Sequence, residues 1–180
     1  MNNLVALMKQ SLGDEDIMKF MDDDIQITKY SDIRSMKSID DLLGKFGRCI
    51  ILFEIEGFNN GHWTLLQHCK DPTSKKSYLL FFDSYGYMPE NELNAIDSNI
   101  KKMTDQHRGY LLRLLYDQPL QVRYNQFKLQ KLKSGVNTCG KWCCIKGLFP
   151  YCNETDFAEL VQSTNYTPDE LICLLYESMK

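Results

Sequence analysis

The sequence predicts an α+β fold in which a small central sheet, mixed or antiparallel, is flanked by helices. Three apolar extended segments follow one another with short turns between them, which is typical of an antiparallel meander. Helical patterns with recognisable start signals lie before and after these segments. With 180 residues, 43% of them hydrophobic and 12% aromatic, the chain can bury a substantial core. We expect one domain over residues 1–180, because no repeat, linker or low-complexity segment interrupts it.

The first part of the chain predicts two short helices with an extended piece between them. Residues 14–21 carry apolar side chains at helical spacing, and the three aspartates at 22–24 end this helix. An extended piece follows at residues 25–27. Ser38 then begins a capping box that opens a second short helix, which Gly44 ends.

The middle of the chain predicts the sheet. Residues 49–55 are apolar enough to form an interior strand. The glycine- and asparagine-rich residues 57–61 predict a turn, so the chain returns through residues 62–66 as a hairpin. A third strand over residues 78–82 ends at Asp83. These three strands form the expected meander.

The remaining segments predict helices and one more strand. Residues 90–116 are mostly helical in pattern, as two helices broken near Gly109. Residues 120–124 follow Pro119 and predict a strand, and residues 139–149 predict a helix. Helices close the chain. The last of them begins at a capping box formed by Thr167 and Glu170, with Pro168 in its first turn.

Charge and cysteine usage restrict the classes of partner. A net charge of −3 argues against a broadly basic surface, so we expect no strong nucleic-acid binding, and no apolar run approaches the length of a membrane span. The seven cysteines show no regular spacing and no secretory pattern precedes them, which favours free thiols in a reducing compartment. We expect no metal and no cofactor, because paired C-x2-C elements are absent and Cys143 and Cys144 are adjacent.

Cys139 is the candidate nucleophile. It stands at the start of the helix predicted over residues 139–149, where unpaired N–H groups and the positive end of the helix dipole favour a thiolate. Thr138 can cap the helix, and Gly140 lets other backbone or a substrate approach closely. The alternative for a lone cysteine is a small buried helix residue. Candidate partners upstream favour catalysis.

His62 and Asp83 are those partners. His62, between Gly61 and Trp63 at the edge of the sheet, is the candidate general base, and it is the best placed of three histidines. Asp83 would accept a hydrogen bond from the imidazole and stabilise its cationic form. The structural alternative for Asp83 is a turn-forming residue. We interpret Trp63 as a wall against the histidine, with a core aromatic as its alternative.

Gln130 is the candidate oxyanion donor, together with the backbone N–H of Cys139. Gln126 lies four residues earlier, which is one helical turn, and remains an alternative for this role.

The residue order His62, Asp83, Gln130 and Cys139 resembles that of a known clan of cysteine proteases. The motifs are Gly61-His62-Trp63, Phe82-Asp83-Ser84-Tyr85-Gly86 and Thr138-Cys139-Gly140-Lys141-Trp142-Cys143. They resemble the adenovirus-protease and ubiquitin-like-protease clan, and within it most the maturation proteases of virophages, Polinton-type elements and large DNA viruses. The resemblance covers roughly residues 48–149.

The resemblance implies an adenain-like fold with the nucleophile at the N-terminus of a central helix. It implies a cysteine endopeptidase in which His62, Asp83, Gln130 and Cys139 are catalytic, and Trp63 and Gly140 contact substrate. Its expected substrates are viral capsid and core precursors during virion maturation, in the virion and the host-cell cytoplasm. An activating peptide is left open, whereas activation by DNA is not expected from this charge. The alternatives are a deconjugating isopeptidase for ubiquitin-like proteins and an inactive interaction module of the same fold.

Overall fold

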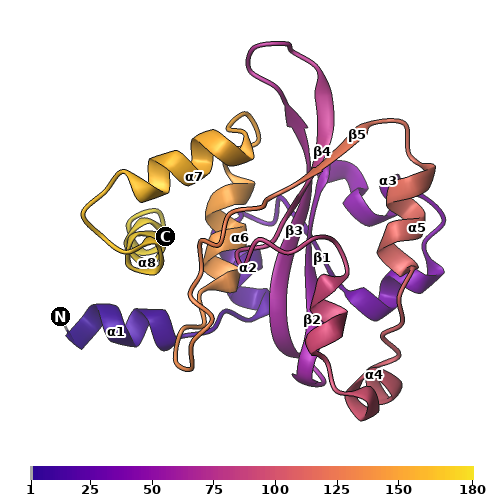
Figure 1. Cartoon of the computed structure of the whole chain (residues 1–180), viewed down its shortest axis with the longest axis horizontal. Helices are drawn as coiled ribbons and strands as arrows, with labels where there is room; N and C mark the ends of the chain where they lie inside the picture. Colours follow the sequence, from indigo (N-terminus) through magenta and orange to yellow (C-terminus); the bar gives the residue numbers. More distant parts are fainter. Residues whose placement is uncertain (1) are drawn as a thin grey trace.

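The computed structural model describes residues 2–180 and shows an α+β fold built on one five-stranded mixed sheet with helices on both faces (Figure 1). The strands lie in the spatial order β1-β2-β3-β4-β5. They are β1 (Gln26–Lys29), β2 (Arg48–Gly57), β3 (Asn60–Lys70), β4 (Ser77–Phe82) and β5 (Gln121–Tyr124). The predicted fold class, with a mixed sheet flanked by helices, is confirmed.

The pairing of the strands confirms the meander and adds a strand at each side. Strands β2, β3 and β4 pair antiparallel, as predicted, and β3 is the central strand. The extended piece near residues 25–27 becomes β1 and pairs parallel with β2. Strand β5 pairs parallel with β4. Parallel edge strands need long crossovers, and here helices and loops supply them.

The helices agree with the start and end signals of the sequence. Ser38 accepts a hydrogen bond from the backbone of Asp41, and Gly44 ends that helix. Gly109, where a break between two helices is predicted, is the N-cap residue of a later helix. The segment predicted as two helices contains three pieces, of which the first is a short 3-10 helix. The α-helices are α1 (Asn2–Lys9), α2 (Asp14–Phe20), α3 (Ile39–Leu43), α4 (Ser98–Thr104), α5 (Tyr110–Asp117), α6 (Cys139–Gly147), α7 (Glu154–Gln162) and α8 (Pro168–Ser178). The 3-10 helices are η1 (Tyr30–Ser35), η2 (Gly44–Phe46) and η3 (Asn91–Ala95).

Two hydrophobic cores lie on opposite faces of the sheet. On one face, alternate residues such as Ile50 and Leu65 pack against α2, α6, α7 and α8, which lie to the left of the sheet in Figure 1. On the other face, Ile51 and Leu66 pack against η1, α3 and α5, to the right. Since both faces are covered, residues 49–53 of β2 and 78–82 of β4 are apolar and buried throughout rather than alternating, as the sequence of β2 predicts.

Helix α6 is the central helix of the first core, and all nine of its residues are buried. Two of them are lysines whose charged groups are satisfied by backbone carbonyls. The Nζ atom of Lys146 donates to the carbonyls of Phe149 and Cys152 at 3.0 and 2.9 Å, and that of Lys141 donates to the carbonyl of Gln10. A helix packed on all sides holds its first residue, Cys139, in a fixed position.

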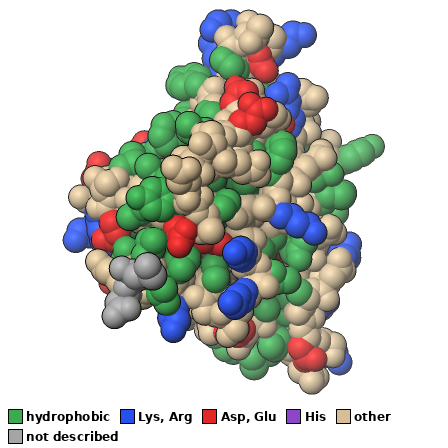
Figure 2. All heavy atoms as spheres, turned by 60° about the vertical axis from the view of Figure 1, so that its left-hand side comes forward, with side chains coloured by type: hydrophobic (Ala, Val, Ile, Leu, Met, Phe, Trp, Pro, Cys, Tyr) green, Lys and Arg blue, Asp and Glu red, His purple; other side chains and the backbone are tan. Residues whose placement is uncertain are grey.

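Figure 2 shows one face of the molecule with charged and apolar side chains distributed over it. Apolar side chains there alternate with Lys, Arg, Asp and Glu rather than gathering into a patch of one charge. Within residues 2–180, no helix is long and apolar enough to cross a membrane.

Candidate active site

Three elements bring His62, Asp83 and Cys139 together. His62 lies near the start of β3, Asp83 comes directly after β4, and Cys139 is the first residue of α6. All three side chains are withdrawn from solvent, since the residues are 4%, 0% and 9% exposed. In such surroundings, interactions between charges are much stronger than in water.

The imidazole of His62 is paired with the carboxylate of Asp83. Its Nε2 atom lies 3.0 Å from Oδ2 of Asp83, while Oδ1 accepts from the backbone N–H of Tyr85 at 2.5 Å. Burial favours the neutral form of each partner, but their mutual attraction outweighs it. The pKa of His62 is therefore raised well above its usual value, and the pKa of Asp83 is lowered. The structure thus favours an imidazolium beside an ionised Asp83.

The thiol of Cys139 lies against the same imidazole. Burial alone would raise its pKa, but His62, by hydrogen bonding and by charge, and the backbone N–H groups of Trp63 and Gly140 outweigh burial and lower it. Since Nε2 of His62 is taken by Asp83, Nδ1 is the ring nitrogen left to exchange a proton with the sulfur.

Cys139 differs in this respect from every other cysteine of the chain. All seven cysteines lie in the described part of the chain and carry free thiols. Burial raises the pKa of the other six, which are Cys49, Cys69, Cys143, Cys144, Cys152 and Cys173. For Cys144, only five residues from Cys139 in the same helix, the pKa rises to about 12. The lowered pKa of Cys139 therefore belongs to its position beside His62 and the N–H groups of Trp63 and Gly140, and other positions of α6 do not share it.

Thr138 does not cap α6 with its side chain, so this prediction is wrong. It has helical backbone angles, and its Oγ1 donates instead to Oδ1 of Asp169 in α8, at 2.6 Å. The same carboxylate accepts from Nε1 of Trp142 at 3.2 Å and from the backbone N–H of Lys131 at 2.9 Å. Asp169, which the sequence analysis missed, therefore fixes the beginning of α6 from a distant helix.

Gln130 lies beside the segment that carries Asp83, whereas Gln126 is exposed. Oε1 of Gln130 accepts from Oγ of Ser84 at 2.7 Å. Its Nε2 donates to the hydroxyl of Tyr85 at 3.1 Å and to the carbonyl of Val136 at 3.2 Å. Of the two glutamines, Gln130 is thus the one buried at the site, with its amide already engaged.

The loop that carries Gln130 is held to the loop that follows β4 by further bonds. The backbone N–H groups of Leu129 and Gln130 both donate to the carbonyl of Ser84 at 2.9 Å. Nδ2 of Asn125 donates to the carbonyl of Asp83 at 2.6 Å. These bonds fix the position of Gln130 relative to Asp83.

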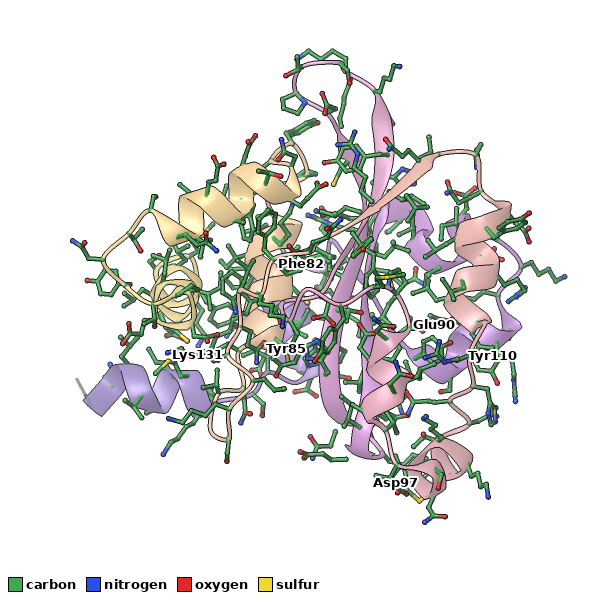
Figure 3. The ribbon with its side chains drawn as sticks, in the orientation of Figure 1. Phe82, Tyr85, Glu90, Asp97, Tyr110 and Lys131 are labelled. Atoms are coloured by element: carbon green, nitrogen blue, oxygen red, sulfur yellow. The ribbon has the colours of Figure 1, made fainter. Side chains whose placement is uncertain are left out.

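Tyr85 is a second residue that the sequence analysis missed. Its ring stacks on the imidazole of His62, with ring centroids 4.7 Å apart and planes inclined by 23°. Figure 3 shows it close to the end of β4, between the sheet and α6. Tyr85 lies within the sequence motif from Asp83 to Gly86, but the motif alone does not show that its ring contacts the imidazole of His62.

Trp63 and Gly140 contact each other in the core. Nε1 of Trp63 donates to the carbonyl of Leu12 at 2.9 Å, and its ring covers Gly140. A Cβ atom at Gly140 would lie 3.0 Å from Cβ of Leu12 and 3.3 Å from Cδ1 of Trp63. The close approach that we expected at Gly140 is therefore made by Leu12 and Trp63. Trp63 also lines a cavity of about 390 Å³ with residues of β1 and α2.

Residues 2–180 contain no group of three or more histidine, cysteine, aspartate or glutamate side chains placed to hold a metal ion. The groups that the site brings together are the thiol of Cys139, the imidazole of His62 and the carboxylate of Asp83.

The chain has a relative among virophage proteins. No family model matches it. The crystal structure of ASFV pS273R protease is a distant structural match, with a TM-score of 0.37 and 14% sequence identity. That match covers 72% of this chain and 41% of the protease, so the chain spans about two fifths of the protease's length. Uncharacterized protein V9 of Sputnik virophage is 33% identical over 179 residues, covering 97% of this chain and 99% of V9. The chain belongs to the same protein family as V9.

Proposed function

We propose that the chain is a cysteine endopeptidase with Cys139 as nucleophile, His62 as acid and base, and Asp83 as the residue that orients the imidazole. One observation carries this proposal: the buried imidazole of His62 lies 3.0 Å from Asp83 and also acts on the thiol of Cys139, whose pKa it lowers. This is the geometry that nucleophilic catalysis by a thiol requires.

The first half of the reaction forms an acyl-enzyme. The thiolate of Cys139 attacks the carbonyl carbon of the scissile peptide bond, and the carbonyl oxygen becomes an oxyanion. The backbone N–H of Cys139, at the positive end of α6, and the amide of Gln130 are the proposed donors to that oxyanion. The C–N bond then breaks, the imidazolium of His62 gives its proton to the departing amine, and a thioester on Cys139 remains.

The second half of the reaction restores the enzyme. His62, now neutral, takes a proton from a water molecule whose oxygen attacks the thioester carbonyl. The C–S bond breaks, the acid product leaves, and the thiolate of Cys139 again faces the imidazolium. Asp83 stays ionised throughout and stabilises the imidazolium each time it forms.

Membership of a virophage protein family supports a viral protein as the substrate. A protease encoded with a virus has the structural precursors of the particle available to it, so we propose capsid or core precursors as substrates. The proposed sites of action are accordingly the virion and the cytoplasm of the infected cell.

Cleavage profiling of a diverse peptide library by mass spectrometry tests the proposal. The samples are the wild-type protein, Cys139→Ala, and Cys152→Ala as a matched control, since Cys152 is a partly buried cysteine with a raised pKa. We expect the same cleavage pattern from the wild type and the control, and none from Cys139→Ala. Cleavage that survives Cys139→Ala would disprove the proposal.

Two other outcomes point to the alternatives. Cleavage of a folded ubiquitin-like precursor, with no cleavage of peptides, would favour a deconjugating isopeptidase. Absence of any cleavage, together with a Cys139 thiol no more reactive toward iodoacetamide than that of Cys152, would favour an inactive interaction module.

A further inference from the structure

Glu92 is a buried carboxyl group that the proposed reaction does not use. It lies in η3, is 1% exposed, and neither of its carboxyl oxygens accepts a hydrogen bond within residues 2–180. An ionised carboxylate in such surroundings would lose its hydration without replacement, which costs far more than burying a neutral acid. The side chain therefore needs an explanation.

Glu90, two residues earlier, is also buried, but both of its carboxyl oxygens accept hydrogen bonds. Its Oε1 accepts from the hydroxyl of Tyr30 and from the backbone N–H groups of Leu111 and Leu112, at 2.7, 2.9 and 3.1 Å. Its Oε2 accepts from the N–H of Gly109 at 2.9 Å. Figure 3 shows Glu90 on the side of the sheet where Tyr110 begins α5. Glu90 thus accepts hydrogen bonds from the free backbone N–H groups at the start of α5, whereas Glu92 has no such donor in the described part of the chain.

The group that faces Glu92 is Asp83. Asp83 acts on Glu92 through a side-chain hydrogen bond and through its charge, and the charge of His62 also acts on both carboxyl groups. Oδ2 of Asp83 is held by His62 and Oδ1 by the backbone of Tyr85, so Asp83 is the carboxylate of the pair. Two adjacent buried carboxyl groups cannot both ionise without strong repulsion. Burial, followed by the hydrogen bond and charge of Asp83, raises the pKa of Glu92 well above its usual value.

We propose that Glu92 is a neutral carboxylic acid that donates its O–H to the carboxylate of Asp83. The site then consists of four side chains in series, in the order Glu92, Asp83, His62 and Cys139. Glu92 is a positioning residue in this series. It holds Asp83 ionised and oriented toward His62 while its own proton stays in place. The hydrogen bond does not depend on the proposed function, but its effect on catalysis does.

Infrared spectroscopy of the wild-type protein at neutral pH tests the hydrogen bond directly. A buried protonated carboxyl group has a C=O stretch resolved from those of carboxylates and amides. We expect one such band that shifts on labelling with carboxyl-¹³C glutamate, disappears in Glu92→Gln, and persists in Glu56→Gln, an exposed control on β2. The same band is expected in Cys139→Ala, so the result stands whether or not the chain is a protease. A band that shifts with labelled aspartate instead, or no band, would overturn the proposal.

The effect on catalysis separates a positioning role from a structural one. Glu92→Gln keeps an N–H donor toward Asp83, so we expect kcat/KM within about threefold of wild type and an unchanged pH profile. Glu92→Leu removes the donor, so we expect a loss of about tenfold in kcat and an acidic limb moved to higher pH, as Asp83 becomes easier to protonate. Equal losses in both variants with unchanged pH profiles would reduce Glu92 to a structural residue.

Discussion

The Nε2 atom of His62 lies 3.0 Å from Oδ2 of Asp83, and both side chains are almost completely buried. An imidazole that is buried alone becomes a weaker base, because burial disfavours its charged form. The charge of Asp83 reverses this effect, so the pKa of His62 is raised rather than lowered. The reactivity of Cys139 therefore depends on a residue that it does not need to touch.

Replacing Asp83 by Asn tests this dependence. Without the charge of Asp83, the pKa of His62 falls, so the imidazolium beside the sulfur is lost at a lower pH and the pKa of Cys139 rises. We expect the pH at which Cys139 becomes reactive toward iodoacetamide to increase, and kcat/KM at neutral pH to fall by about 10²–10⁴. Alkylation followed by peptide mass spectrometry reports Cys139 separately, with Cys152 as the internal control. If Cys139 became reactive at the same pH in Asp83→Asn as in the wild type, Asp83 would not act on His62 and Cys139.

The two glutamines give a second prediction. Gln130 is buried between Ser84 and Tyr85, whereas Gln126 is exposed. If the amide of Gln130 turns from Tyr85 or Val136 to a developing oxyanion, Gln130→Ala lowers kcat by about 10²–10³ and leaves KM nearly unchanged. Gln126→Ala should keep the wild-type kcat. The opposite ranking, measured on the same peptide, would assign the oxyanion donor to Gln126.

Features decided by neighbouring residues could be predicted from the sequence. The helix that begins after Ser38 and the helix that begins after Thr167 both start where their capping boxes predict. The three strands of the meander are joined by short turns, so their order follows from the chain itself. The segments that carry His62, Asp83 and Cys139 were predicted for the same reason.

Features decided by distant contacts could not be predicted. Thr138 has the side chain of a capping residue, but a carboxylate from α8 takes its hydroxyl. Glu92 and Asp169 look like acidic residues at the starts of helices, which are usually solvated. Lys141 looks exposed, yet the carbonyl group of Gln10, far away in the sequence, allows its burial. In each case, the deciding partner is far away in the sequence or is reached only after folding.

Asp169 provides a prediction about stability. Its carboxylate accepts hydrogen bonds from Thr138, Trp142 and Lys131, so Asp169→Ala leaves two buried donors and one partly buried donor without an acceptor. We expect a loss of about 3 kcal/mol or more in the free energy of unfolding, measured by urea denaturation. Glu170→Ala, the next residue in the exposed capping box, is the control and should lose clearly less. Equal losses would mean that capping of α8, rather than the contact with α6, explains the effect.

Gly61 gives a prediction about the position of His62. A Cβ atom at this residue would lie 1.8 Å from the carbonyl oxygen of Phe53 and 2.7 Å from the backbone nitrogen of Ile55, beside the register shift between β2 and β3. Backbone atoms in a central hairpin cannot move aside as a flexible side chain can. We therefore expect Gly61→Ala to destabilise the protein by about 3 kcal/mol and to displace the adjacent His62. In Gly13→Ala, the new Cβ would meet only the carboxyl of Asp16, at 3.8 Å, so this control should fold with nearly wild-type stability. Thermal denaturation compares the stabilities, and the iodoacetamide profile of Cys139 reports the imidazole. If Gly61→Ala matched the control in both measurements, the close approach of the two strands would not be what holds His62 in place.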